Sequence, residues 1–103
     1  PDILHAVRQT QRRTAVLLGL ETDVCVLHSA LGLLDLGYRV VVVGDATGSP
    51  EPGHKTGLAR MRQAGVLIVT MKGLFYEWLR TVNDVIRFHK DCPDMRDQAG
   101  VVL

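Results

Sequence analysis

The chain has 103 residues and a mass of 11.3 kDa, which is the size of one domain. Hydrophobic residues make up 47% and charged residues 22% of the chain, a composition that excludes intrinsic disorder. The longest stretch without a charge, residues 24–34, is too short to span a membrane. Basic and acidic residues nearly balance, and the net charge of +1 is too small for a protein that binds nucleic acid through its phosphates. We therefore expect neither a nucleic-acid partner nor a membrane partner.

The two cysteines, Cys25 and Cys92, lie far apart in the chain and lack the spacing of metal ligands or of a disulfide scaffold. We therefore expect a reducing, cytoplasmic location and no metal site. No glycine-rich dinucleotide motif or P-loop follows a predicted strand, so we expect no cofactor. The chain opens on Pro1 with a helical pattern at once, and we expect it to be a fragment or a processed product of a longer protein.

Helical and extended patterns alternate along the chain. The predicted helices cover residues 2–12, 23–36, 54–63 and 74–88. The predicted strands cover residues 15–18, 39–43 and 66–70. Either Thr22 or Asp23 is suited to cap the second helix, and Gly37 stands where a left-handed residue ends it. A loop rich in turn residues covers residues 47–53, after the second predicted strand.

The three strands are uninterrupted apolar runs, which are typical of a parallel sheet with helices on both faces. Right-handed crossovers would place these strands side by side as one half of a doubly wound α/β fold. The first strand would then lie along an open edge, and an open edge invites pairing. We expect either another copy or a missing N-terminal half to cover it, and we expect the chain to form a homo-oligomer.

Cys25 falls in the first turn of a helix that directly follows the first strand. In such sheets, ligands bind outside the carboxyl ends of the strands. Unpaired backbone N–H groups and the helix dipole favour an anion there, such as a thiolate or the oxyanion of a tetrahedral intermediate. Cys25 is therefore a candidate nucleophile. The alternative is that Cys25 is a small buried hydrophobe, as unpaired cysteines often are.

The residues around Cys25, Gly19-Leu20-Glu21-Thr22-Asp23-Val24-Cys25-Val26, resemble the nucleophile motif of the isochorismatase-like cysteine hydrolases. That superfamily includes isochorismatases, nicotinamidases and other amidohydrolases, and the similarity continues over residues 15–80. It implies a Rossmann-like isochorismatase fold of which only the C-terminal three strands are present. Residues 1–89 would form the C-terminal part of this domain, and residues 90–103 would form a tail.

The resemblance implies that a Cys-Asp-Lys triad cleaves a C–N amide bond or a vinyl ether in a small molecule through a covalent cysteine intermediate. It also implies a cis peptide bond between Leu20 and Glu21, and an oxyanion hole formed by the N–H groups of Glu21 and Cys25. The family's Asp and Lys precede its cysteine, whereas no lysine and no strand ending in a carboxylate precede Cys25. We expect both residues in a missing N-terminal part.

For each of four other polar residues, a role in the site is weighed against a structural or surface role. His28 is a possible base one turn after Cys25, but packing explains it better. Asp45 ends the second strand, and we expect it to accept hydrogen bonds from the Thr47-Gly48 turn. We expect His54 and Lys72 to lie on the surface. Two other functions stay open: a non-catalytic half-domain that is stable only by association, and a small flavodoxin-like binding domain.

Overall fold

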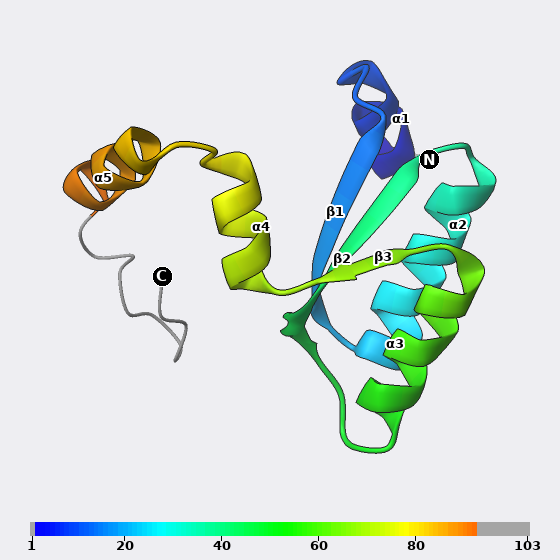
Figure 1. The fold of residues 1–103 in the computed structure, drawn as a ribbon. Coiled ribbons are helices and arrows are strands. Elements are labelled where there is room, and N and C mark those ends of the chain that lie inside the picture. Colours follow the sequence, from blue (N-terminus) through cyan, green and yellow to red (C-terminus); the bar gives the residue numbers. More distant parts are fainter. Residues whose placement is uncertain (1, 93–103) are drawn as a thin grey trace.

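A computed structural model describes residues 2–92 of the chain. It contains a sheet of three strands, β1 (Thr14–Leu20), β2 (Arg39–Gly48) and β3 (Leu67–Val69), which are all parallel and lie in the order β1-β2-β3 (Figure 1). This arrangement confirms the predicted parallel α/β sheet. Within the described residues, β1 is an edge strand, as the sequence predicts.

Strand β2 is longer than predicted and does not end at Gly44. Its register with β1 shifts between Leu17 and Gly19, after which Gly19 pairs with Thr47 and Leu20 pairs with Gly48. The sequence favours a turn there because Gly, Asp and Ser are poor strand formers, but strand pairing overrides that weak preference. As a result, the end of β1 lies beside the segment that follows β2.

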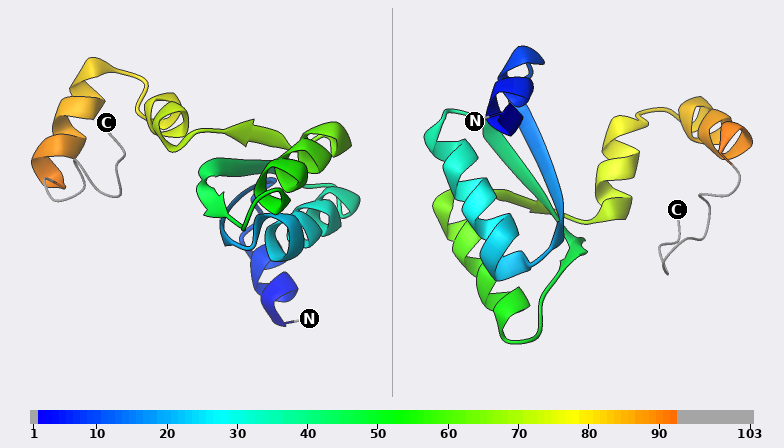
Figure 2. Two further views of the ribbon diagram at one scale, coloured as in Figure 1. Left: turned by 90° about the horizontal axis from the view of Figure 1, so that it is seen from below. Right: turned by 180° about the vertical axis from the view of Figure 1, so that it is seen from behind.

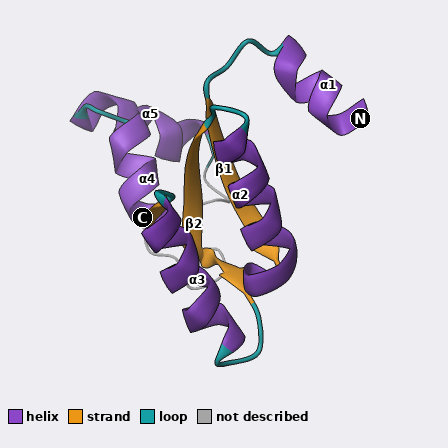
Figure 3. Ribbon diagram, turned by 90° about the vertical axis from the view of Figure 1, so that its right-hand side faces the viewer, coloured by secondary structure: helices purple, strands orange, loops and turns teal. Residues whose placement is uncertain are grey.

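One face of the sheet is covered by α2 (Leu27–Asp35) and α3 (Gly53–Ala64), which lie side by side (Figure 3). The core between these helices and the sheet is aliphatic. Its buried members are Val26, Leu27, Ala30, Val40, Val42, Met61 and Val66. Gly37 and Gly65 follow the two helices with φ of 91° and 106°, a left-handed conformation that suits glycine. The prediction for Gly37 is therefore confirmed.

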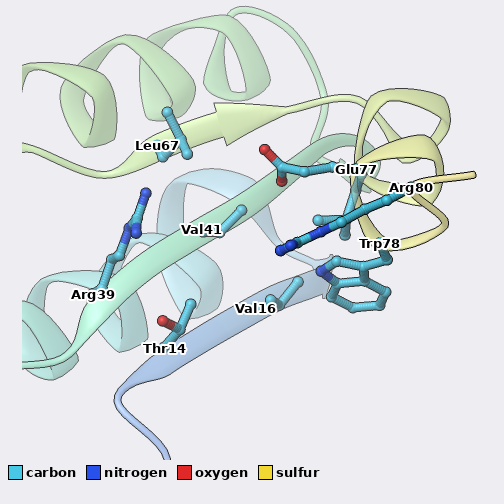
Figure 4. Close-up of a pocket in the computed structure, with 9 residues that line it drawn as sticks. Thr14, Val16, Arg39, Val41, Leu67, Glu77, Trp78 and Arg80 are labelled. Carbon is cyan, nitrogen blue, oxygen red and sulfur yellow. The ribbon is translucent and has the colours of Figure 1, made fainter.

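The opposite face of the sheet is covered by α4 (Met71–Trp78). A hollow of about 470 Å³ remains between this helix and the sheet, and α4 brings Glu77 and Trp78 to it (Figure 4). The sheet supplies Val16, Val41 and Leu67 to its lining. Helices therefore lie on both faces, but this second face is only partly covered.

The prediction of a single helix over 74–88 is wrong, because the chain forms two helices there, α4 and then α5 (Val82–Asp91). Two threonines cap these helices: Thr70 Oγ1 accepts the Gly73 N–H at 3.0 Å, and Thr81 Oγ1 accepts the Asp84 N–H at 3.1 Å. Such caps satisfy backbone N–H groups that a helix start leaves free. Helix α5 extends away from the sheet (Figure 2) and runs past the predicted start of the tail at residue 90. The rest of that tail, from residue 93, lies outside the described residues.

Helix α1 (Asp2–Gln9) is shorter than the predicted 2–12, and Gln11 follows it with φ of 58°. This helix buries none of its residues, but its apolar side lines a hollow against α2. Across residues 2–92, no helix combines the length and the hydropathy that crossing a bilayer requires.

Candidate functional site

The predicted site lies where β1 passes into the following helix. The structure begins this helix with five residues in π-helical conformation, η1 (Thr22–Val26), and α2 continues from it. The Glu21 carbonyl accepts the N–H groups of Val24 at 3.3 Å and Val26 at 3.0 Å. Glu21 occupies the N-cap position without a side-chain hydrogen bond, so the predicted capping by Thr22 or Asp23 is wrong. Instead, the Asp23 side chain bonds to Ser49 after β2, and the Thr22 side chain bonds to His54 in α3.

The peptide bond between Leu20 and Glu21 is cis, although Glu21 is not proline. This is the bond to which the resemblance assigns a cis conformation. Gly19 precedes it with φ of 125°, a value that side chains rarely permit.

Cys25 is exposed, and it is a free thiol. It lines a small hollow of about 150 Å³ whose other walls are mostly apolar. These walls are Leu17, Leu18, Leu20, Val26 and Ser29. Cys25 is thus not the buried hydrophobe of the alternative interpretation.

Three hydrogen bonds connect the turn that carries Cys25 to Ser49, which follows β2, and to His54 in α3. The Thr22 N–H donates to Ser49 Oγ at 2.7 Å, and Ser49 Oγ donates to Asp23 Oδ1 at 2.8 Å. Thr22 Oγ1 lies 2.8 Å from His54 Nδ1. Thr22 is completely buried, so its hydroxyl needs this partner.

Helix α3 approaches the same turn closely at Gly53 and Gly57. A Cβ added at Gly57 would lie 2.9 Å from Asp23 Cα and 3.1 Å from Asp23 N. A Cβ added at Gly53, one helical turn earlier, would clash with the Asp23 carboxylate. Glycine at position 57 lets the helix come into contact with the backbone of the turn, and glycine at position 53 leaves room for the Asp23 carboxylate.

The structure corrects the reading of His54 as a surface residue, because its ring contacts Thr22 and is half-buried. Sequence reasoning also missed Ser49, and no local pattern marks either residue as a partner of the cysteine turn. Their contacts join positions 32 and 27 apart in the chain, and only the sheet brings these positions together.

His28 lies on α2 and lines the hollow against α1, and no hydrogen bond links it to the Cys25 thiol. Asp45 accepts a hydrogen bond from the Met71 N–H at 2.8 Å, whereas the Thr47 hydroxyl donates to the Gly44 carbonyl at 3.0 Å. Asp45 therefore has the structural role that we expected, but its donor is the start of α4 and not the nearby turn. Lys72 is exposed, as expected.

No group of three or more His, Cys, Asp or Glu side chains suitable for a metal ion occurs in the part of the chain that the structure describes. The candidate site there consists of an exposed thiol, a cis peptide bond before a helix start, and a hydrogen-bonded support behind the turn. This arrangement brings a free thiol and the backbone N–H groups of a helix start to the same end of the sheet.

A family model described as Isochorismatase domain matches residues 1–73. Isochorismatase family protein 2A of Dictyostelium discoideum is 43% identical over 72 residues, which are 69% of this chain and 36% of the relative. The chain thus spans about a third of the length of the curated relatives that it matches.

Two solved structures agree with this match. The YcaC gene product of Escherichia coli, an octameric hydrolase of unknown specificity, is 31% identical with a TM-score of 0.76 over 93% of this chain and 50% of that chain. The pyrazinamidase/nicotinamidase of Streptococcus mutans is 34% identical with a TM-score of 0.62 over 66% of this chain and 39% of its own.

Proposed function

This chain belongs to the isochorismatase family, and from that premise we propose that it supplies the nucleophile of a cysteine hydrolase. The observation that carries this proposal is the exposed Cys25 thiol in the first turn of the helix after β1. A helix start presents N–H groups that have no acceptor earlier in the helix, and these groups stabilise negative charge. Cys25 is therefore both accessible and close to groups that suit a charged intermediate.

For an amide substrate, the Cys25 thiolate attacks the carbonyl carbon, and the C=O electron pair moves onto the oxygen. The N–H groups of Glu21 and Cys25 bind this oxyanion. The C=O bond then re-forms, the C–N bond breaks, and the amine leaves with a proton from the general acid. Water attacks the resulting thioester, loses a proton to the same group acting as base, and releases the acid and the thiolate.

The acid–base group and the lysine of the triad come, in this proposal, from a part of the domain that these 103 residues do not contain. Two residues of this chain support that placement: Asp45 is bonded to the start of α4, and Lys72 is exposed on that helix. The chain spans about a third of its curated relatives, which leaves ample sequence in such a domain for both groups.

The substrate class that we propose is a small molecule with a cleavable C–N amide bond or a vinyl ether. The similarity to a pyrazinamidase/nicotinamidase supports the amide. We also propose a cytoplasmic location, since both described cysteines are free thiols.

The nucleophile is tested by alkylating the chain with iodoacetamide at neutral pH and measuring each cysteine by mass spectrometry. Cys92 is the internal control, because it is half-buried at the end of α5. We expect Cys25 to react faster than Cys92 in the folded chain, and we expect this preference to disappear in denaturant. A second assay uses 4-nitrophenyl acetate, whose acyl group should transfer to Cys25 with a stoichiometric burst of 4-nitrophenolate that Cys25→Ser abolishes.

Equal reactivity of the two cysteines would instead favour the second candidate, a non-catalytic half-domain that is stable by association. A specific observation supports association: Leu18, Leu67 and Trp78 are 59%, 45% and 65% exposed around the partly covered sheet face. Exposed apolar surface of this kind marks interaction sites. We propose that the chain self-associates, as its octameric Escherichia coli relative does.

A further inference from the structure

Ser49, the residue that follows β2, makes contact with the cysteine turn. Its hydroxyl accepts the Thr22 N–H at 2.7 Å and donates to Asp23 Oδ1 at 2.8 Å. A serine hydroxyl has only one proton to donate, and here that proton goes to Asp23. The Ser49 side chain thus binds the backbone N–H of Thr22 and the carboxylate of Asp23, two successive residues of the turn.

The peptide unit between Glu21 and Thr22 is consequently fixed at both of its polar atoms. Its N–H is bound by Ser49, and its carbonyl accepts the Val26 N–H at 3.0 Å. A peptide unit is planar, so two such bonds on opposite sides fix its orientation. This plane lies between the cis bond and the residue that carries the thiol.

The other half of the support is steric. Asp23 packs against Gly57 and Gly53 of α3, where an added Cβ would find no room. Asp23 is therefore held both by the Ser49 hydroxyl and by contact with α3.

We propose that Ser49 is a positioning residue for the nucleophile: it sets the direction of the backbone N–H groups of the turn and thereby the reactivity of Cys25. This inference rests on the proposed function. Ser49 acts through Thr22 and Asp23 and does not itself contact the substrate.

The chain offers a matched control on the same strand end. Thr47 also uses its hydroxyl in a hydrogen bond, but it donates to the Gly44 carbonyl at 3.0 Å and has no bond to the turn. Thr47→Ala thus removes a half-buried hydroxyl of the same segment and leaves the support of Thr22 and Asp23 in place.

The experiment measures the alkylation rate of Cys25 relative to Cys92 in the full chain, together with the free energy of unfolding. We expect Ser49→Ala, which removes both bonds of the hydroxyl, to slow Cys25 about two- to tenfold, a range that the net contribution of even a single hydrogen bond reaches. Ser49→Thr, which keeps the hydroxyl, should restore the rate, and Thr47→Ala should leave it unchanged even where both alanine variants lose similar stability. If Ser49→Ala does not fold, Asp23→Ala removes one of the two bonds and should slow Cys25 by a smaller factor.

A Ser49→Ala chain whose Cys25 reacts at the wild-type rate overturns the inference and leaves the proposed function standing. An equal slowing by Thr47→Ala overturns it as well, because the effect would then follow from stability alone. Wild-type Cys25 that reacts no faster than Cys92 overturns the proposed function itself.

Discussion

Thr22 Oγ1 lies 2.8 Å from Nδ1 of His54, and this contact joins the start of η1 to the start of α3. Thr22 has no exposed surface, so water cannot replace the histidine as its partner. We expect Thr22→Val, which keeps the shape but removes the hydroxyl, to lower the free energy of unfolding by about 1 kcal/mol. Urea denaturation measures this change. Thr56→Val on the exposed side of α3 is the control and should stay within about 0.5 kcal/mol of the wild type.

A double variant shows whether the two residues act together. Once Thr22 is valine, His54→Ala should cost less than it does in the wild-type chain, because the shared hydrogen bond is already lost. Fully additive effects would mean that the 2.8 Å contact contributes nothing to stability.

Gly57→Ala should destabilise the chain by about 1–3 kcal/mol, because the added Cβ would approach Asp23 Cα to 2.9 Å and force the turn away from α3. The control is Gly32→Ala in α2, where nothing lies within 4 Å of an added Cβ. That change should stabilise the chain by about 0.5–1 kcal/mol, since alanine is the better helix former. Thermal or urea denaturation compares the two, and the same sign for both would contradict the close approach at Gly57.

Asp45 connects the sheet to α4 through its bond to the Met71 N–H. We expect Asp45→Ala to lower stability by about 0.5–1.5 kcal/mol and to loosen the first turn of α4. Trp78, the one tryptophan of the chain, ends this helix and reports the change through its fluorescence. Asp45→Asn retains an oxygen acceptor and should behave more like the wild type, whereas equal effects of both variants would show that the charge and not the hydrogen bond matters.

Helices α4 and α5 carry apolar side chains that the chain itself leaves uncovered. Trp78, Val82 and Ile86 are 65%, 76% and 59% exposed. If the chain self-associates through this surface, Ile86→Asp should shift the population toward monomer in sedimentation velocity. Ile3→Asp on α1, at a position 81% exposed, should not. A wild-type chain that sediments as a monomer at every concentration would contradict self-association.

The strand order and the two long helices of the core follow from patterns that the sequence displays directly. Apolar runs such as Val40–Val43 are buried on both sides, and parallel sheets require such runs. Gly37 ends its helix in the conformation that glycine favours. The position of Cys25 at a helix start after the edge strand is another result of the same alternation of elements.

Periodicity could not locate the break between α4 and α5, since apolar residues continue on both sides of it. The signal was Thr81 followed by Asp84 in a first turn, and the structure uses this threonine as a cap. The pattern of apolar residues also does not indicate that the helix begins with the π-helical segment η1. The partners of Thr22 and Asp23 come from a segment more than 25 positions away, so a local reading of the sequence could not identify Ser49 or His54.

The outer side of β1 has no neighbouring strand within residues 2–92, and the turn with Cys25 follows directly from this strand. In a parallel sheet, carboxyl ends gather at one rim. Any further strand that docks in parallel onto β1 would therefore deliver its last side chains next to the sulfur. The open edge of β1 thus also determines on which side of the Cys25 turn the end of such a strand would lie.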